Sequence, residues 1–130
     1  MIVLHVAHGV KGLLEPDESF FEWGSEIGLY FKSGRRPVCG PCFFWPLTAG
    51  PVAPRLQERL LADLERTQPE LLIIAKWTVF QNGPPQRPVL EWFEPRYRPL
   101  TGGRGRGPYF LVFVRRGGKL ERRLERVAVR

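Results

Sequence analysis

An amphipathic segment followed by a wholly apolar one constrains the fold of this chain more than any other feature. In residues 54–67 the leucines fall on one side of a helix and most charged side chains face the other way (Leu56, Leu60, Leu61 and Leu64 against Arg55, Glu58, Arg59, Asp63 and Arg66). Pro69 ends this helix, and residues 71–75 then have the sequence LLIIA, which is typical of a strand buried on both faces of a sheet. The pair predicts a helix packed on a sheet that has a central, parallel strand.

Weaker local patterns predict the elements before this pair. Residues 3–14 fit a helix, and residues 19–23 fit a short strand. A turn at Gly24 then leads into a second helix, which Ser25 could cap and which Gly34 ends. The order of strand, tight turn and helix is typical of an α/β unit.

Three further segments complete the pattern. Residues 38–45 form a second apolar run, and residues 89–97 predict a short helix rich in aromatic side chains. Residues 109–115 and 120–129 flank two consecutive glycines at 117–118, which predicts a closing hairpin. The last segment also has apolar residues at the spacing of a helix, so its type stays open (Leu120, Leu124 and Val127).

Strands that alternate with helices and end in a hairpin predict an α/β sandwich of two or three layers, with a largely parallel sheet and an antiparallel C-terminal edge hairpin. A chain of 130 residues with 43% hydrophobic and 25% charged side chains fits a single domain spanning residues 1–130. No apolar run approaches the roughly 20 residues of a spanning helix. The apolar start is cut short by His5, which argues against a signal peptide. We therefore expect this chain to be soluble.

The net charge of +7 is concentrated near the C-terminus. Residues 104–130 carry nine basic and two acidic side chains, whereas the rest of the chain carries 11 of each. Arginine offers a fixed fork of donors to phosphate oxygens, so Arg115, Arg116, Arg122 and Arg123 are candidate contacts to phosphates of nucleic acid or lipid head groups. The alternative is a solvated edge whose charges discourage pairing with another sheet.

A glycine-rich segment raises the question of RNA. Residues 101–107 (TGGRGRG) resemble glycine- and arginine-rich RNA-binding segments in composition. One short copy between a helix and a strand is more often a connecting loop. The neutral body of the chain and this single copy do not favour nucleic acid as a partner.

Residues 39–42 (CGPC) have the spacing and the central residues of a thioredoxin-like redox motif. In such a motif a helix continues from the second cysteine, whereas here residues 43–46 are aromatic, extended and stopped by proline. Val38 also stands where a tryptophan usually precedes the motif. We therefore interpret Cys39 and Cys42 as a structural disulfide or as paired core thiols, with thiol redox chemistry as the alternative.

Zinc is a second use for the cysteines. His5 and His8 could join Cys39 and Cys42 in a tetrahedral site. The 30 residues between the two pairs hold a predicted strand and helix, so the arrangement would not be a compact finger. Histidines near a terminus usually face solvent, and we assign no metal.

Candidates for acid–base chemistry are few. The acidic residues Asp17, Glu18, Glu22 and Glu26 cluster where a turn and a helix start favour carboxylates anyway. No nucleophile motif, phosphate-binding loop or complete dinucleotide fingerprint occurs in the sequence. We assign no catalytic residue and no cofactor.

Several short motifs follow one another in a particular order. They are residues 17–24 (DESFFEWG), 29–30 (LY), 33–37 (SGRRP), 60–66 (LLADLER), 68–74 (QPELLII) and Tyr97. In this order they resemble the extracytoplasmic C-terminal domains of polytopic, protein-mannosyltransferase-like glycosyltransferases of the GT-C superfamily. The resemblance covers roughly residues 15 to 115, and the order of the motifs carries more weight than any one of them.

In this family a sugar is transferred from a polyprenyl-phosphate donor by acidic residues in a loop between early transmembrane helices. The aqueous C-terminal domain helps to shape or cover the acceptor side. None of those catalytic residues can be matched here, and residues 38–42 (VCGPC) stand where the family usually has a Ser-Arg or similar pair. The resemblance thus implies a non-catalytic domain on the extracytoplasmic face of a membrane. Its partner would be the transmembrane part of the same polypeptide, and it could take a lipid phosphate or a glycan as a ligand.

Three residues of the resembling passage are predicted to bind a ligand. Arg35 and Arg36 would lie in a loop at the edge between strand and helix, where α/β domains usually bind ligands. Tyr30 belongs to the same passage, although a core position is the favoured interpretation for it. The alternative to this whole reading is a free-standing thiol-redox, zinc-binding or nucleic-acid-binding module.

Overall fold

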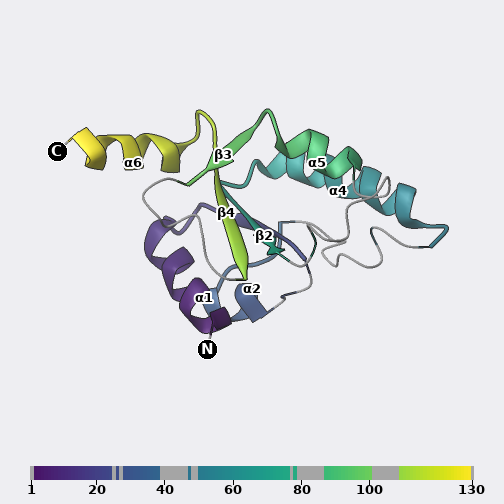
Figure 1. Ribbon diagram of the computed structural model, residues 1–130, viewed down its shortest axis with the longest axis horizontal. Coiled ribbons are helices and arrows are strands. Elements are labelled where there is room, and N and C mark those ends of the chain that lie inside the picture. Colours follow the sequence, from purple (N-terminus) through teal and green to yellow (C-terminus); the bar gives the residue numbers. More distant parts are fainter. Residues whose placement is uncertain are drawn as a thin grey trace.

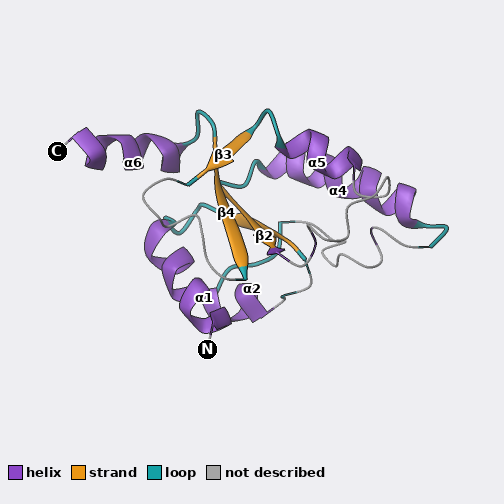
Figure 2. Ribbon diagram, in the orientation of Figure 1, coloured by secondary structure: helices purple, strands orange, loops and turns teal. Residues whose placement is uncertain are grey.

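A four-stranded sheet forms the centre of the computed structural model, and helices lie on both of its faces (Figures 1 and 2). The structure describes residues 2–24, 26, 28–38, 47, 50–76, 78, 87–100 and 109–129. Along the chain the elements are α1 (Ile2–Leu13), β1 (Phe20–Trp23), α2 (Gly28–Ser33), α4 (Ala53–Thr67), β2 (Leu71–Ala75), α5 (Arg87–Phe93), β3 (Tyr97–Pro99), β4 (Phe110–Arg115) and α6 (Lys119–Val129).

The strands lie in the order β1-β2-β4-β3, which makes β2 a central strand as predicted. β1 and β2 are parallel, whereas β4 pairs antiparallel with both β2 and β3. All side chains of β1 and all but Ile74 of β2 are buried. The predicted α/β sandwich is confirmed. The sheet is mixed and not largely parallel, because among the described strands β1 and β2 pair parallel whereas β4 pairs antiparallel with both of its neighbours.

Each strand contributes to two cores because successive side chains point to opposite faces of a sheet. Phe20 and Ile73 belong to the core under α1 and α2 (with Ala7, Val10, Leu14, Leu29 and Tyr30), which the start of α6 also enters through Leu120. Phe21 and Leu72 belong to the core under α4 and α5 (with Leu60, Leu64, Val89 and Phe93). The domain therefore has three layers, with the sheet in the middle.

Helix α4 confirms the prediction for residues 54–67. Leu60 and Leu64 are fully buried on its inner face. Gln68 adopts a left-handed conformation with φ of 47°, and its backbone N–H donates to the carbonyl of Leu64 at 2.9 Å, which closes the helix. The short link through Pro69 then delivers the chain directly into β2.

The predicted C-terminal hairpin is wrong in its second half, because α6 follows β4 instead of a strand. In a strand, alternation would place Arg122 on the same face as Leu120 and Leu124. In the helix both leucines turn toward the core while Arg122 is exposed. Gly117, with φ of 73°, supplies the turn before the helix. The antiparallel edge of the sheet is formed by β3 and β4.

Other predictions agree with the structure within a few residues. α1, β1 and α2 confirm the helix, strand and helix predicted from residues 3 to 34. The helix predicted for residues 89–97 is α5, which ends at Phe93 so that Tyr97 can begin β3. Ser25, residues 39–45 and residues 101–107 lie outside the described residues, and so do Cys39, Cys42 and the side chain of His5. In the part of the chain that the structure describes, no helix combines the length and the apolar character that a membrane crossing requires.

Candidate functional site at the amino edge of the sheet

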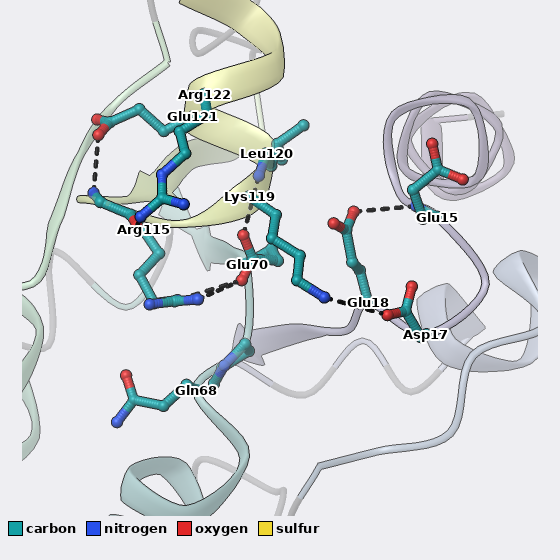
Figure 3. A network of polar contacts seen from close by, with 12 residues as sticks. Glu15, Asp17, Glu18, Gln68, Glu70, Arg115, Lys119, Leu120, Glu121 and Arg122 are labelled. Atoms are coloured by element: carbon teal, nitrogen blue, oxygen red, sulfur yellow. Dashed lines mark hydrogen bonds and ion pairs between the residues drawn. The ribbon is translucent and has the colours of Figure 1, made fainter.

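Most of the arginines singled out from the sequence gather at one end of the strands, where the parallel strands begin. We call this end of the sheet the amino edge. β1 and β2 begin there because they are parallel, and β4 ends there because it is antiparallel to β2. The turn before β1 and the start of α6 meet at the same place (Figure 3). The amino edge comprises residues 13–19, Glu70, residues 115–123, and the side chains of Arg35 and Arg98.

Glu70 is the buried acid that ties β2 to β4 and to α6, and its side chain is 6% exposed. Its Oε2 accepts hydrogen bonds from Nη2 of Arg115 at 2.6 Å and from Nε at 3.2 Å, and its Oε1 accepts from the backbone N–H of Leu120 at 3.0 Å (Figure 3). This places a carboxylate at the helix N-terminus, where the first N–H groups lack partners within the helix. Gly118 is needed beside it, because a Cβ there would lie 2.6 Å from Oε1.

Glu18 and Arg123 form the second buried contact of the amino edge. Nη1 and Nη2 of Arg123 donate to Oε2 and Oε1 of Glu18, each at 2.6 Å, and Nη2 also donates to the carbonyl of Leu13 at 2.8 Å. The backbone N–H of Glu15 adds a hydrogen bond to Glu18 Oε1 at 3.0 Å. The hydrogen bonds from Arg123 hold the pKa of the Glu18 carboxyl below its usual value, and those to Glu18 raise the pKa of Arg123. The pair fixes α6 to the turn before β1.

Two further contacts surround the start of α6. Glu121 accepts a hydrogen bond from the backbone N–H of Gly117 at 2.8 Å and forms an ion pair with Arg98 of β3. The hydrogen bond from the Gly117 N–H has the largest effect and lowers the pKa of Glu121, and the hydrogen bond from Arg98 lowers this pKa further. Lys119 contacts Asp17 at 3.3 Å, but both side chains are more than two-thirds exposed, so this ion pair contributes little. The N-terminal half of α6 is thus held from several sides.

Arg35, which was expected to bind a ligand, also lies at the amino edge. It reaches back from the end of α2 and donates to the carbonyls of Glu15 at 2.6 Å, Glu18 at 2.9 Å and Leu14 at 2.9 Å. These contacts close the turn between α1 and β1. Because its guanidinium serves three carbonyl groups of its own chain, Arg35 acts in this structure as a positioning residue for that turn.

Tyr30 is a core residue that packs beside β1. Its ring stacks on Phe20 with centroids 4.6 Å apart, and its hydroxyl accepts a hydrogen bond from the backbone N–H of Glu22 at 2.8 Å. Glu22 is 1% exposed, and its Oε1 accepts from the backbone N–H of Glu26. The residue after the strand has to be glycine, because a Cβ on Gly24 would overlap Oε2 of Glu22 and would lie 2.8 Å from Cβ of Ala75. The Trp-Gly pair of the sequence therefore marks a tightly packed strand end.

The predicted phosphate contacts divide into two kinds. Arg115 and Arg123 are engaged by buried carboxylates, as described above. Arg116 and Arg122 are exposed, and their side chains donate to the backbone carbonyls of Tyr97 at 3.2 Å and of Gly117 at 3.1 Å, respectively. Arg36 is also exposed. Among the arginines predicted to bind a ligand or phosphate, Arg36, Arg116 and Arg122 are therefore the ones that an external anion could reach most readily.

The carboxylates of the amino edge are suited to forming fixed ion pairs and not to transferring protons. A general acid needs a pKa near the working pH, whereas the pKa values of Glu18 and Glu121 are lowered by their partners. Within the described ranges no group of three or more His, Cys, Asp and Glu side chains is placed to hold a metal ion. What this edge can offer a ligand is positive charge from its exposed arginines.

Sequence reasoning missed Glu70 and Glu121, and it did not identify Arg123 as the partner of Glu18. Glu70 stands directly before the apolar segment of β2, Arg115 directly after that of β4, and their strands pair antiparallel. A charged residue at each end of two apolar strands is a usable signal, because paired strands can bring such ends together. Nothing local in the sequence indicates that Glu18 would meet Arg123, 105 positions away.

The fold and this site define a small three-layer α/β domain in which ion pairs at the amino edge hold a C-terminal helix. Comparison with protein-family models, with curated proteins and with solved structures gives no significant match.

Proposed function

We propose that this chain is a non-catalytic domain of a membrane glycosyltransferase that uses a polyprenyl-phosphate-linked sugar. In that enzyme it helps to cover or bind the acceptor side on the extracytoplasmic face. Its partner is the transmembrane part of the same polypeptide, and its exposed arginines at the amino edge contact phosphate or glycan groups.

One observation carries the proposal. The motif residues 17–24, 29–30 and 33–37, which resemble those of that family, form one continuous unit of turn, strand, tight turn and helix. Gly24 packs against Glu22 and Ala75, and Arg35 closes the turn before the strand. The motif is thus a closely packed structural unit of this domain. It carries no reacting group of its own.

The state of the carboxylates supports a non-catalytic role. Glu18 and Glu70 are buried and bound by arginine, so neither is available as a base or nucleophile. Transfer chemistry would then belong to another part of the enzyme. Arg116 and Arg122 remain exposed at the amino edge and suit phosphate oxygens, because each offers a fork of donors.

The experiment is to read the natural coding sequence upstream of residue 1 and to assay the complete protein. We expect a series of hydrophobic spans and, in membranes, transfer of sugar from a polyprenyl-phosphate donor. Replacing Arg116 and Arg122 with glutamine should weaken transfer several-fold, while the same change at the exposed Arg55 and Arg59 of α4 should not. A natural start with no spans, or full transfer by an enzyme that lacks this domain, would contradict the proposal.

A further inference from the structure

The apolar side of α6 begins in the core and runs out of it. Leu120 is 1% exposed and Leu124 is partly buried against the same core, whereas Val127 is 70% exposed. Figure 1 shows the end of α6 extending away from the sheet and from the other helices, toward the C-terminus. The last turns of α6 therefore present an apolar side chain that the domain itself does not cover.

Charge is distributed unevenly around this helix. Successive residues of a helix are 100° apart, and the apolar residues of α6 define a line along it (Leu120, Leu124 and Val127). The basic residues lie on one side of this line (Lys119, Arg122, Arg123 and Arg126), and the acidic residues lie on the other (Glu121 and Glu125). Lys119 and Arg123 are engaged by Asp17 and Glu18. Arg122 and Arg126 are exposed, one helical turn apart. Arg126 therefore lies beside the uncovered Val127 on the part of α6 that leaves the domain. Arg122 lies about 140° from Val127 around the helix axis and donates to the carbonyl of Gly117.

The small size of this surface decides which partner suits it. A stable protein interface buries about 800 Å² on each partner, which one valine and part of a leucine do not provide. Nucleic acid would use the arginines and leave Val127 in water. An anionic lipid surface uses both, because arginine binds the head groups while the apolar side chain enters the boundary below them.

We propose that the end of α6, through Arg126 and Val127, rests on an anionic lipid surface. The inference builds on the proposed function, since a domain already tethered to a membrane enzyme needs only a weak additional contact to fix its orientation. The contact would set which edge of the domain faces the membrane.

Vesicle binding by the isolated 130-residue chain tests this directly. Co-sedimentation is measured with vesicles of phosphatidylcholine alone and with vesicles that also contain phosphatidylglycerol. Each arginine near an anionic surface contributes roughly a fivefold increase in partitioning, so Arg126→Gln should lower the partition coefficient about fivefold. Val127→Ser should lower it by a factor of about three to five. The double variant should lose about 15- to 25-fold.

Matched controls lie at the opposite end of the molecule in Figure 1. Val52 is 56% exposed at the start of α4, and Arg55 is exposed within α4. Val52→Ser and Arg55→Gln repeat the same chemical changes and should alter partitioning less than about twofold. Circular dichroism of each variant establishes that the fold is kept.

Several results would overturn the inference. One is the absence of preference for phosphatidylglycerol, and another is an equal loss in the α4 and α6 variants, which would mean that only net charge matters. Binding of single-stranded RNA that depends on Arg126 but not on Val127 would assign the helix to nucleic acid instead. Sugar transfer by the complete enzyme is a separate readout, so failure of this inference and failure of the proposed function can be told apart.

Discussion

Replacing Arg123 with glutamine removes the cation that neutralises Glu18 and holds α6 against the turn before β1. Removing one partner of a buried ion pair costs about 3 to 5 kcal/mol. The side chain of Glu18 is 3% exposed but that of Arg123 is 25% exposed, so solvent can reach the pair from one side. We therefore expect Arg123→Gln to lower the free energy of unfolding by about 3 kcal/mol, at the lower end of that range.

A double-mutant cycle separates this ion pair from the other contacts of Arg123. Glu18→Gln should cost less, about 1 to 2 kcal/mol, because the freed arginine can turn toward solvent. Since the two residues are in contact, the double variant should be about 1 to 2 kcal/mol more stable than the sum of the single effects predicts. Urea denaturation followed by tryptophan fluorescence measures all four proteins. Arg66→Gln is the control, because the Arg66 side chain is 69% exposed in its ion pair with Asp63 and should cost less than about 0.5 kcal/mol.

The dependence on pH gives an independent check with a definite sign. In the wild type the folded pKa of Glu18 lies below its ordinary value of 4.5, so its contribution to stability is present above that value and is lost as the pH falls through the folded pKa. In Arg123→Gln the carboxylate is buried without its cation, which raises its pKa. The difference in unfolding free energy should then shrink on acidification from neutral pH. A cost below about 0.5 kcal/mol, an additive cycle or a difference that does not change with pH would refute this reasoning.

The remaining predictions concern packing and one buried hydroxyl group. Gly24→Ala should lower the free energy of unfolding by about 1 to 3 kcal/mol, because the new methyl group overlaps Glu22. Gly9→Ala, in open space on α1, should instead raise the free energy of unfolding by about 0.5 to 1 kcal/mol. Equal effects of the two variants in urea denaturation would contradict the packing argument. The Tyr97 hydroxyl donates to the carbonyl of Pro69 at 2.5 Å, so Tyr97→Phe should cost about 1 kcal/mol at neutral pH. Burial raises the pKa of Tyr97 above its ordinary value of 10.0, so the wild type should lose stability as the pH rises beyond that value, and an alkaline titration of the variant should show a smaller loss.

Local patterns were sufficient to predict the elements whose apolar residues follow a clear pattern along the sequence. The leucines of α4 and the unbroken apolar run of β2 predict their structure because helix and strand repeats differ. Gly34 ends α2 with φ of 72°, as a C-terminal glycine should. The segment after Gly117 was ambiguous for a physical reason, since its apolar residues fit both a strand and a helix over so short a length.

For the candidate site, too, one part could be predicted from the sequence and another part could not. Excess positive charge near the C-terminus is plain in the sequence, and four arginines there were predicted to face phosphate. Two of them, Arg115 and Arg123, instead neutralise acids that lie 45 and 105 positions away along the chain. A count of charges cannot distinguish an arginine that meets solvent from one that meets a buried carboxylate. Only the pairing of the strands and the docking of α6 decide between them.

By itself, the sequence determined the α/β class, the helix at 54–67, the central strand at 71–75 and the concentration of basic residues beyond residue 103. These depend on side-chain periodicity and composition, which are local properties of the chain. The tertiary structure decided that β4 pairs with β2, that the last segment is a helix, and that Glu18 and Glu70 take Arg123 and Arg115 as partners. Buried charge must be neutralised, and the neutralising residue can come from any part of the chain that the fold brings near.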